Sequence, residues 1–339
     1  MAKELISEKQ LLAKVKELKQ KIPEKFRKIL ILFFDCYNEA VHAAGHPSDE
    51  ALKTLLLFLD LVEEQFEHPF DFEPYHKKVR KPIDYYAFSL DFIRPFIDMQ
   101  KSRAVGLEHL DTIAKQLKRK ENVILFANHQ TETDPQVIAI LLEKKYPEIA
   151  EKIIYVAGER VVTDPLAIPF SMGCDLLCIY SKRYIDHPPE LKLKKQLHNK
   201  STMELMSSLL KEGGKIIYVA PSGGRDRKNQ DGVVEVAPFD PASVEMFYLM
   251  AKKAKTPTHF YPFSLDTYDV MPPPDTIQKE LGEARYAKHS SVHLAFAPEF
   301  DMEHFPGSDQ NEKNLRRQAR ADAIWNIVDA NYQKLAKLP

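Results

Sequence analysis

The chain has 339 residues, of which 44% are hydrophobic and 29% charged, and its formal net charge is −1. This length allows a large buried core and about two domains. The near-neutral charge excludes a generally basic protein that coats nucleic acid, so we expect no nucleic-acid partner. No apolar run approaches the roughly 18 residues of a membrane-spanning helix, and the N-terminus lacks the apolar segment of a secretory signal. The three cysteines cannot all pair, so we predict a reduced, soluble, intracellular protein with at most peripheral membrane contact.

The N-terminal part of the chain predicts helices. Apolar residues recur at helical spacing over three stretches, 5–22, 24–43 and 49–66. Pro23 and the sequence Gly45-His46-Pro47 separate these stretches, and a polar, proline-bearing linker follows them at 68–82. We therefore predict a small helical bundle as a first domain, residues 1–80, and a second domain, residues 81–339.

The second part alternates apolar, β-rich runs with helical patterns. The predicted strands are 123–127, 152–158, 174–181, 215–221, 258–265 and 291–298. The predicted helices are 135–146, 189–212, 240–254 and 309–336. This alternation predicts an α/β domain, with a large, mostly parallel sheet flanked by helices. In such sheets, chemistry usually collects at the carboxyl ends of the strands.

A burst of polar residues, NHQTETDP (128–135), follows the strand that ends near residue 127. Asp134 before Pro135 is a common helix start, with the aspartate as N-cap, and a lone His129 is more often a core histidine than a catalyst. The pair changes this reading, because four intervening residues let the chain fold back so that the carboxylate meets the imidazole. Such a contact fixes the tautomer and leaves Nε2 free as a general base.

A second polar group, APSGGRDR (220–227), follows the strand at 215–219. In an extended segment Arg225 and Arg227 point to the same side, where two guanidinium groups match a phosphate dianion. Gly223 and Gly224 let the backbone come close to a ligand. The alternative interpretation is a solvated turn with two surface arginines.

These motifs together resemble the glycerolipid acyltransferases, whose first block is His-x4-Asp. The match is closest to the soluble glycerol-3-phosphate 1-acyltransferases of plastid type and their bacterial relatives. It rests on NHQTETDP (128–135), IYSKR (179–183), PSGGRDR (221–227) and APFDPASVE (237–245), in order and spacing. The resemblance extends from about residue 80 to 300 and agrees with a small N-terminal helical domain.

The resemblance implies roles for particular residues. His129 would be the general base and Asp134 its orienting partner. The substrate phosphate would be bound by Arg183, Arg225 and Arg227. This chain has Arg183-Tyr184 where plastid-type enzymes usually have Lys-His, so Tyr184 is a substrate-binding candidate that lacks the histidine's possible charge. Glu132, Gly223 and Gly224 complete the substrate-binding candidates, with Glu132 accepting from a substrate hydroxyl or lying at the helix start.

The implied reaction is acyl transfer from a thioester to the sn-1 hydroxyl of glycerol 3-phosphate. The co-substrate would be acyl carrier protein or acyl-CoA, with no cofactor and no metal. The basic stretch 189–200 is a solvated helix face or a docking surface for that donor. We expect a monomer, in the bacterial cytosol or, after removal of a transit peptide, in the plastid stroma.

Other functions remain open at this point. A 1-acylglycerol-3-phosphate acyltransferase would share the base and phosphate site but usually carries apolar membrane segments. A non-catalytic carrier of phospholipid or acyl chains would not need His129 and Asp134 in register. A metal-dependent phosphoesterase would need further ligands. Covalent catalysis by Ser222 is disfavoured because Ala220 stands where a nucleophile elbow has glycine, and Cys174 and Cys178 lie in an apolar run typical of core thiols.

Overall fold

The computed structural model describes residues 13–14, 16–18, 21–181, 185–274 and 281–339. The described helices are α2 (Glu24–Ala44), α3 (Ser48–Glu67), α4 (Tyr85–Ile93), α5 (Leu107–Lys118), α6 (Asp134–Leu142), α7 (Pro147–Lys152), α8 (Ile168–Ser171), α9 (Lys192–Glu212), α10 (Pro241–Ala254) and α11 (Lys313–Leu335). Short 3₁₀ turns are η2 (Arg94–Phe96), η3 (Glu159–Val162), η5 (Pro189–Leu191) and η6 (Tyr268–Val270). None of the helices described is both long and apolar enough to cross a membrane.

Ten strands are described, and eight of them form one sheet. They are β1 (Tyr75–His76), β2 (Arg103–Val105), β3 (Asn122–Ala127), β4 (Ile153–Gly158), β5 (Asp175–Ile179), β6 (Ile216–Val219), β7 (Arg227–Lys228), β8 (Val234–Glu235), β9 (Thr258–Asp266) and β10 (His293–Phe296). The order in the sheet is β1-β5-β4-β6-β3-β9-β10-β2. Five neighbouring strands, in the order β5, β4, β6, β3 and β9, are mutually parallel, whereas β1 and β10 are antiparallel to their neighbours β5 and β9. The predicted α/β class with a mixed, mostly parallel sheet is confirmed.

Helices cover both faces of the sheet, as the composition of β3 requires. All six residues of β3 are buried. Val123, Leu125 and Ala127 pack into one apolar core, and Ile124 and Phe126 pack into the other. A strand buried on both faces reads as a continuous apolar run rather than an alternating one. The second core is completed by α9, α10 and α11.

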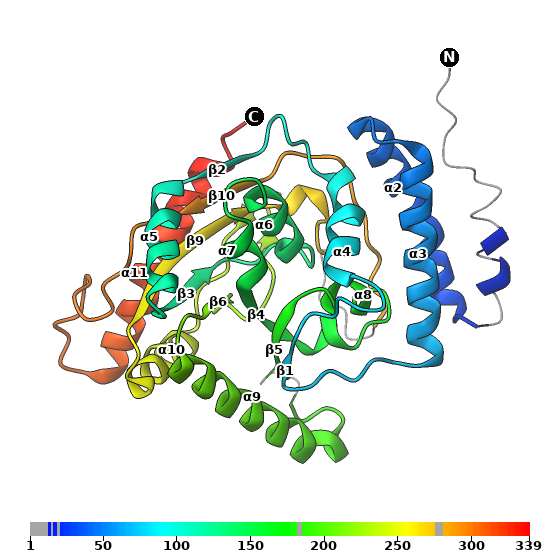
Figure 1. Ribbon diagram of the computed structural model, residues 1–339. Coiled ribbons are helices and arrows are strands. Elements are labelled where there is room, and N and C mark those ends of the chain that lie inside the picture. The colour runs from blue at the N-terminus through cyan, green and yellow to red at the C-terminus, as the bar shows by residue number, and fades with distance from the viewer. Residues whose placement is uncertain (1–12, 15, 19–20, 182–184, 275–280) are drawn as a thin grey trace.

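The N-terminal helices extend the first core. In Figure 1, α2 and α3 lie beside α4 and α8, at the outer side of the sheet's helical layer. Phe33 of α2 stacks on Phe92 of α4, and Phe58 of α3 contacts Phe170 of α8. The predicted helix at 5–22 falls mostly outside the described residues. A division into two domains at residue 80 stays a prediction.

Candidate active site

The loop after β3 is fixed to β9 by one side chain, Asn128. Its Oδ1 accepts from the Leu265 N–H at 2.8 Å and its Nδ2 donates to the Leu265 carbonyl at 2.9 Å. The buried amide thus imitates one more residue of the parallel ladder between β3 and β9. Its Nδ2 also reaches Asp226 Oδ2 at 2.8 Å. The loop that carries the histidine therefore starts from a rigid position.

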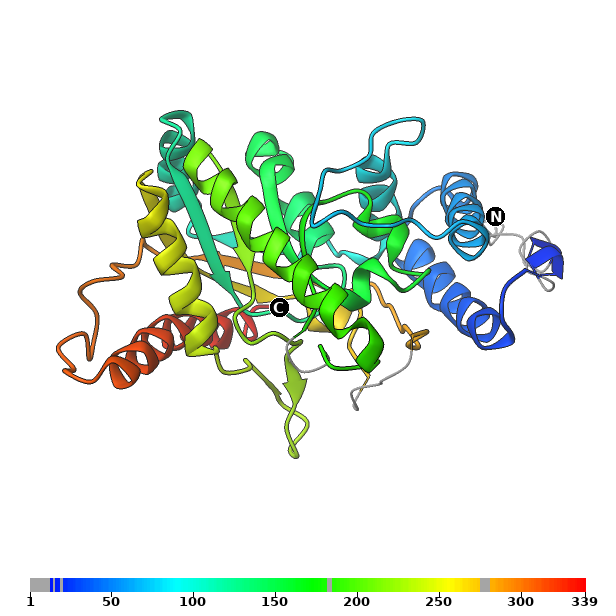
Figure 2. The ribbon, with the colours of Figure 1, turned by 90° about the horizontal axis from the view of Figure 1, so that it is seen from below.

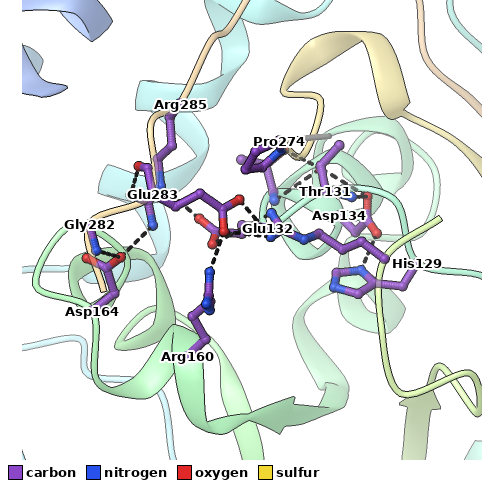
Figure 3. A network of polar contacts seen from close by, with 12 residues as sticks. His129, Thr131, Glu132, Asp134, Arg160, Asp164, Pro274, Gly282, Glu283 and Arg285 are labelled. Atoms are coloured by element: carbon purple, nitrogen blue, oxygen red, sulfur yellow. Dashed lines mark hydrogen bonds and ion pairs between the residues drawn. The ribbon is translucent and has the colours of Figure 1, made fainter. Parts of the chain in front are cut away.

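His129 and Asp134 meet as predicted. Nδ1 of His129 donates to Asp134 Oδ2 at 2.7 Å, and the imidazole is about one-third exposed while Asp134 is buried. A carboxylate only accepts hydrogen bonds, so Nδ1 carries the proton and Nε2 keeps its lone pair. The geometry is therefore that of an oriented general base (Figure 3).

The helix-cap reading of Asp134 is wrong. Helix α6 begins at Asp134 itself, and Thr133 occupies the cap position without a side-chain cap. The carboxylate turns back instead and accepts from Gln130 N at 2.9 Å, Thr131 N at 3.2 Å and Thr267 Oγ1 at 2.6 Å. Asp134 thus fixes the loop before α6, and this loop carries His129.

The second polar motif is bonded to the first. The N–H of Asp226 donates to the His129 carbonyl at 2.7 Å, and Asp226 itself is fully buried. Because side chains alternate along an extended segment, the flanking Arg225 and Arg227 face away from the Asp226 side. Gly223 has a φ of +66° and makes the turn before them, and both it and Gly224 are exposed. The yellow-green hairpin that follows, β7–β8, projects at the bottom of Figure 2.

The two arginines have different surroundings. Arg225 binds both oxygens of Glu283, at 2.7 and 2.9 Å, and its Nη1 lies 3.8 Å from Glu132 Oε1. Arg227 donates to the Pro274 carbonyl. Burial and the neighbouring Arg225 lower the pKa of Arg227 below its usual range. Arg183 and Tyr184 lie outside the described residues, so their predicted roles are not placed.

Glu132 belongs to a buried charge network that sequence reasoning missed (Figure 3). Its Oε2 accepts from Arg285 Nε at 2.8 Å, and Arg285 Nη2 reaches Asp164 Oδ2 at 3.1 Å. Burial would raise the pKa of Glu132, but Arg285 and Arg225 outweigh it and lower that pKa. The other oxygen, Oε1, is buried without a hydrogen-bond partner among the described residues.

A signal for part of this network exists in the sequence. Arg160 follows β4 in the sequence GER (158–160), at the carboxyl end of a predicted strand, where functional groups were expected. Glu283 and Arg285 offer no such signal, because they lie on an irregular segment between β9 and β10. Asp226 lies between Arg225 and Arg227, and nothing in the sequence indicates that it is buried.

An apolar cavity lies against His129 and Glu132. Its walls come from α2, α3, α4, α8 and the segment after η6, through Ile29, Phe33, Phe58, Ile93, Phe170 and Met271. Cys174 also lines it, and burial raises the pKa of that thiol to about 12. A thiol with this pKa stays protonated at neutral pH, so Cys174 is a wall residue rather than a nucleophile.

The raised pKa of Asp226 predicts that the stability of the fold depends on pH. Burial raises its pKa from 3.8 to about 6, so the folded protein retains a proton that the unfolded chain has lost. The stability that this proton contributes is fully present below about pH 4 and is lost as pH rises through 6, an effect of about 3 kcal/mol. Urea unfolding of wild type and Asp226→Asn at pH 4.5 and 7 should show a smaller pH-dependent loss in the variant. Equal losses would contradict the raised pKa.

Comparison with known proteins agrees with this geometry. A family profile described as "Acyltransferase" matches residues 107–266. The chain is 39% identical over 338 residues to the chloroplastic glycerol-3-phosphate acyltransferase of Spinacia oleracea, covering 98% of this chain and 70% of that one. It is 38% identical over 306 residues to the chloroplastic enzyme of that name from Arabidopsis thaliana, covering 90% and 66%.

Among solved structures, the 1-acyl-sn-glycerophosphate acyltransferase of Thermotoga maritima is similar at a TM-score of 0.43 and 15% identity, covering 91% of this chain and 96% of that one. The sequence relatives carry the assignment, because their matches cover 98% and 90% of this chain. The chain belongs to the family of the chloroplastic glycerol-3-phosphate acyltransferases.

Proposed function

We propose that this acyltransferase moves an acyl group from a thioester to the sn-1 hydroxyl of glycerol 3-phosphate, with His129 as general base. One observation carries the proposal: an oriented His–Asp pair stands where an apolar cavity meets a cluster of arginines. An acyl chain needs the first of these surroundings and a phosphate dianion the second. The names of the curated relatives supply the acceptor.

The reaction needs one proton to move. His129 Nε2 takes the proton of the acceptor hydroxyl as its oxygen attacks the thioester carbonyl. The C–O bond forms, the tetrahedral intermediate collapses and the C–S bond breaks. The imidazolium, stabilised by Asp134, returns the proton to the departing thiolate. No covalent enzyme intermediate is required.

Glu132 fits the role of a substrate-hydroxyl acceptor. Its Oε1 is buried without a hydrogen-bond partner among the described residues, while Arg285 holds Oε2. A buried acceptor without a donor is costly, and a hydroxyl of the bound glycerol unit would supply the donor. The phosphate is assigned to Arg225 and Arg227, together with Arg183 and Tyr184, and Gly223 and Gly224 form the adjoining turn.

The direct test is an assay of free-thiol release with glycerol 3-phosphate and a long-chain acyl thioester. The product should be 1-acylglycerol 3-phosphate, with its acyl position established by NMR. A wild-type protein that releases no thiol with either acyl carrier protein or coenzyme A thioesters would overturn the proposal. Acylation of 1-acylglycerol 3-phosphate but not of glycerol 3-phosphate would favour the alternative acyltransferase, and binding without turnover would favour a carrier.

The acyl donor is proposed to be acyl carrier protein, docked on α9. Lys192, Lys194 and Lys200 are exposed on this helix, as are Leu193 and Leu197. The neighbouring lysine in the sequence, Lys195, does not belong to this surface, because it is buried and pairs with Glu159 at 2.9 Å. The exposed lysines suit an acidic protein partner. A monomer working in the bacterial cytosol or the plastid stroma fits such a donor.

Reversing the charges of the three exposed lysines of α9 tests whether this helix recognises acyl carrier protein or acyl-CoA. Lys192→Glu, Lys194→Glu and Lys200→Glu together should raise the KM for acyl carrier protein thioester by about tenfold or more, because complementary charges across an interface favour association. The KM for acyl-CoA should change much less. The matched control reverses Lys252, Lys253 and Lys255, which are exposed at the C-terminal end of α10, just before β9. Equal effects on both donors would remove α9 from donor recognition.

A further inference from the structure

Glu283 occupies an unusual position beside the proposed phosphate site. Its carboxylate is almost completely buried and accepts from two arginines that come from different parts of the fold. Arg225 follows β6 and binds both oxygens, and Arg160 of η3 binds Oε2. Figure 3 shows Glu283 between Arg160 and the Glu132 side of the network.

Among the described residues, the charges of the ion pairs in this network balance. Three arginines, Arg160, Arg225 and Arg285, are linked to three carboxylates, Glu132, Asp164 and Glu283. Buried arginines need such counter-ions, because an unpaired buried charge is expensive. A phosphate dianion that binds Arg225 therefore enters a site that already holds a negative group.

The three carboxylates differ in how easily a phosphate could displace them from the arginines. Glu132 precedes α6 in the loop fixed by Asp134, and Asp164 accepts from the N–H groups of Leu166 and Gly282 as well as from Arg285. Glu283 lies on a segment without regular structure, and its carboxylate is held by arginine side chains alone among the contacts of the described residues. A carboxylate gripped by two guanidinium groups is also the protein group most similar to a bound phosphate.

We propose that Glu283 holds the place of the substrate phosphate, and that Arg160 becomes an additional phosphate ligand when the phosphate displaces this carboxylate. The inference rests on the proposed function, since it concerns the acceptor's phosphate. Glu283 keeps Arg160 and Arg225 in position in the free enzyme. It also sets the affinity for glycerol 3-phosphate, because the phosphate must compete with an internal anion.

The first test is calorimetric binding of inorganic phosphate and of glycerol 3-phosphate to wild type and Glu283→Gln. Removal of the competing charge should tighten both about tenfold, the order of one hydrogen-bonded charge pair. The KM for glycerol 3-phosphate should fall, and the KM for the acyl donor should not. Unchanged or weaker phosphate binding in the variant would overturn the proposal.

The second test distinguishes displacement from a fixed counter-ion. If Arg160 only neutralises Glu283, then Arg160→Gln should have no effect on phosphate binding once Glu283 is glutamine. If Arg160 binds the phosphate that takes the place of the Glu283 carboxylate, Arg160→Gln should still weaken phosphate binding about tenfold in the Glu283→Gln background. No effect in that background would exclude Arg160 as a ligand.

The control is Glu143→Gln. Glu143 also binds an arginine with both oxygens, Arg94 at 2.6 and 3.0 Å, but it lies at the far end of α6. Its replacement should leave phosphate binding unchanged. If Glu283→Gln does not fold, Glu283→Asp keeps the charge while weakening the grip, and binding should still tighten, by a smaller factor; no tightening would overturn the proposal. A wild type that binds neither ligand would instead refute the proposed function.

Discussion

Replacement of His129 with alanine is expected to lower kcat by about 10²–10⁴-fold, the usual contribution of a general base. The KM for glycerol 3-phosphate should change little, because Arg225 and Arg227, which we propose to bind the phosphate, contact other groups than the imidazole among the described residues. The fold should survive, since His129 is about one-third exposed and its backbone carbonyl, not its side chain, binds Asp226. Steady-state kinetics and a thermal melt of the same preparation measure both expectations.

The chain offers a matched control in His304. Its Nδ1 binds Asp301 Oδ2 at 2.9 Å, which repeats the contact of the His129–Asp134 pair on an exposed loop. His304→Ala removes an equivalent histidine–aspartate bond whose residues do not line the apolar cavity beside His129, so kcat should be unchanged. A His129→Ala enzyme as active as His304→Ala would leave the reaction intact but remove His129 from its role as base.

The order of the elements was predictable because their signals are local. Apolar runs such as 123–127 and 258–265 correspond to β3 and β9, and the helical patterns at 189–212 and 240–254 to α9 and α10. Which strands are neighbours was not predictable, since β3 lies between β6 and β9, which come about 90 and 130 residues later. Register and strand order depend on long-range packing that no single segment carries.

In the candidate site, too, contacts within one loop were predictable from the sequence and contacts between distant segments were not. His129 and Asp134 belong to one loop, so their spacing in the sequence reveals their contact. Arg285 reaches Glu132 across 153 positions, on a segment that has neither strand nor helix character. The pairing of Glu132 with Arg285 therefore could not be predicted from the sequence and is known only from the fold. The sequence offered Arg225 as a phosphate ligand, which stays a prediction, but it did not indicate that Arg225 binds the carboxylate of Glu283.

Asp134→Asn should reduce both activity and stability, because no orientation of the amide satisfies the site. Oδ2 accepts from His129 Nδ1 and Gln130 N, and Oδ1 accepts from Thr131 N and Thr267 Oγ1. An NH₂ group at either position would face a backbone N–H. The free energy of unfolding should fall by about 2–4 kcal/mol, as expected when buried donors lose an acceptor.

The loss of activity should exceed the loss of folded protein. An NH₂ facing Nδ1 favours the tautomer with the proton on Nε2, which cannot accept the substrate's proton, so kcat should fall by at least about 10²-fold. Thr267→Val separates the two effects, because it removes one donor from Oδ1 and leaves the His129 contact intact. That variant should lose about 1 kcal/mol of stability with kcat nearly unchanged. An Asp134→Asn protein that is destabilised but retains wild-type kcat would show that Asp134 supports the loop without orienting the base.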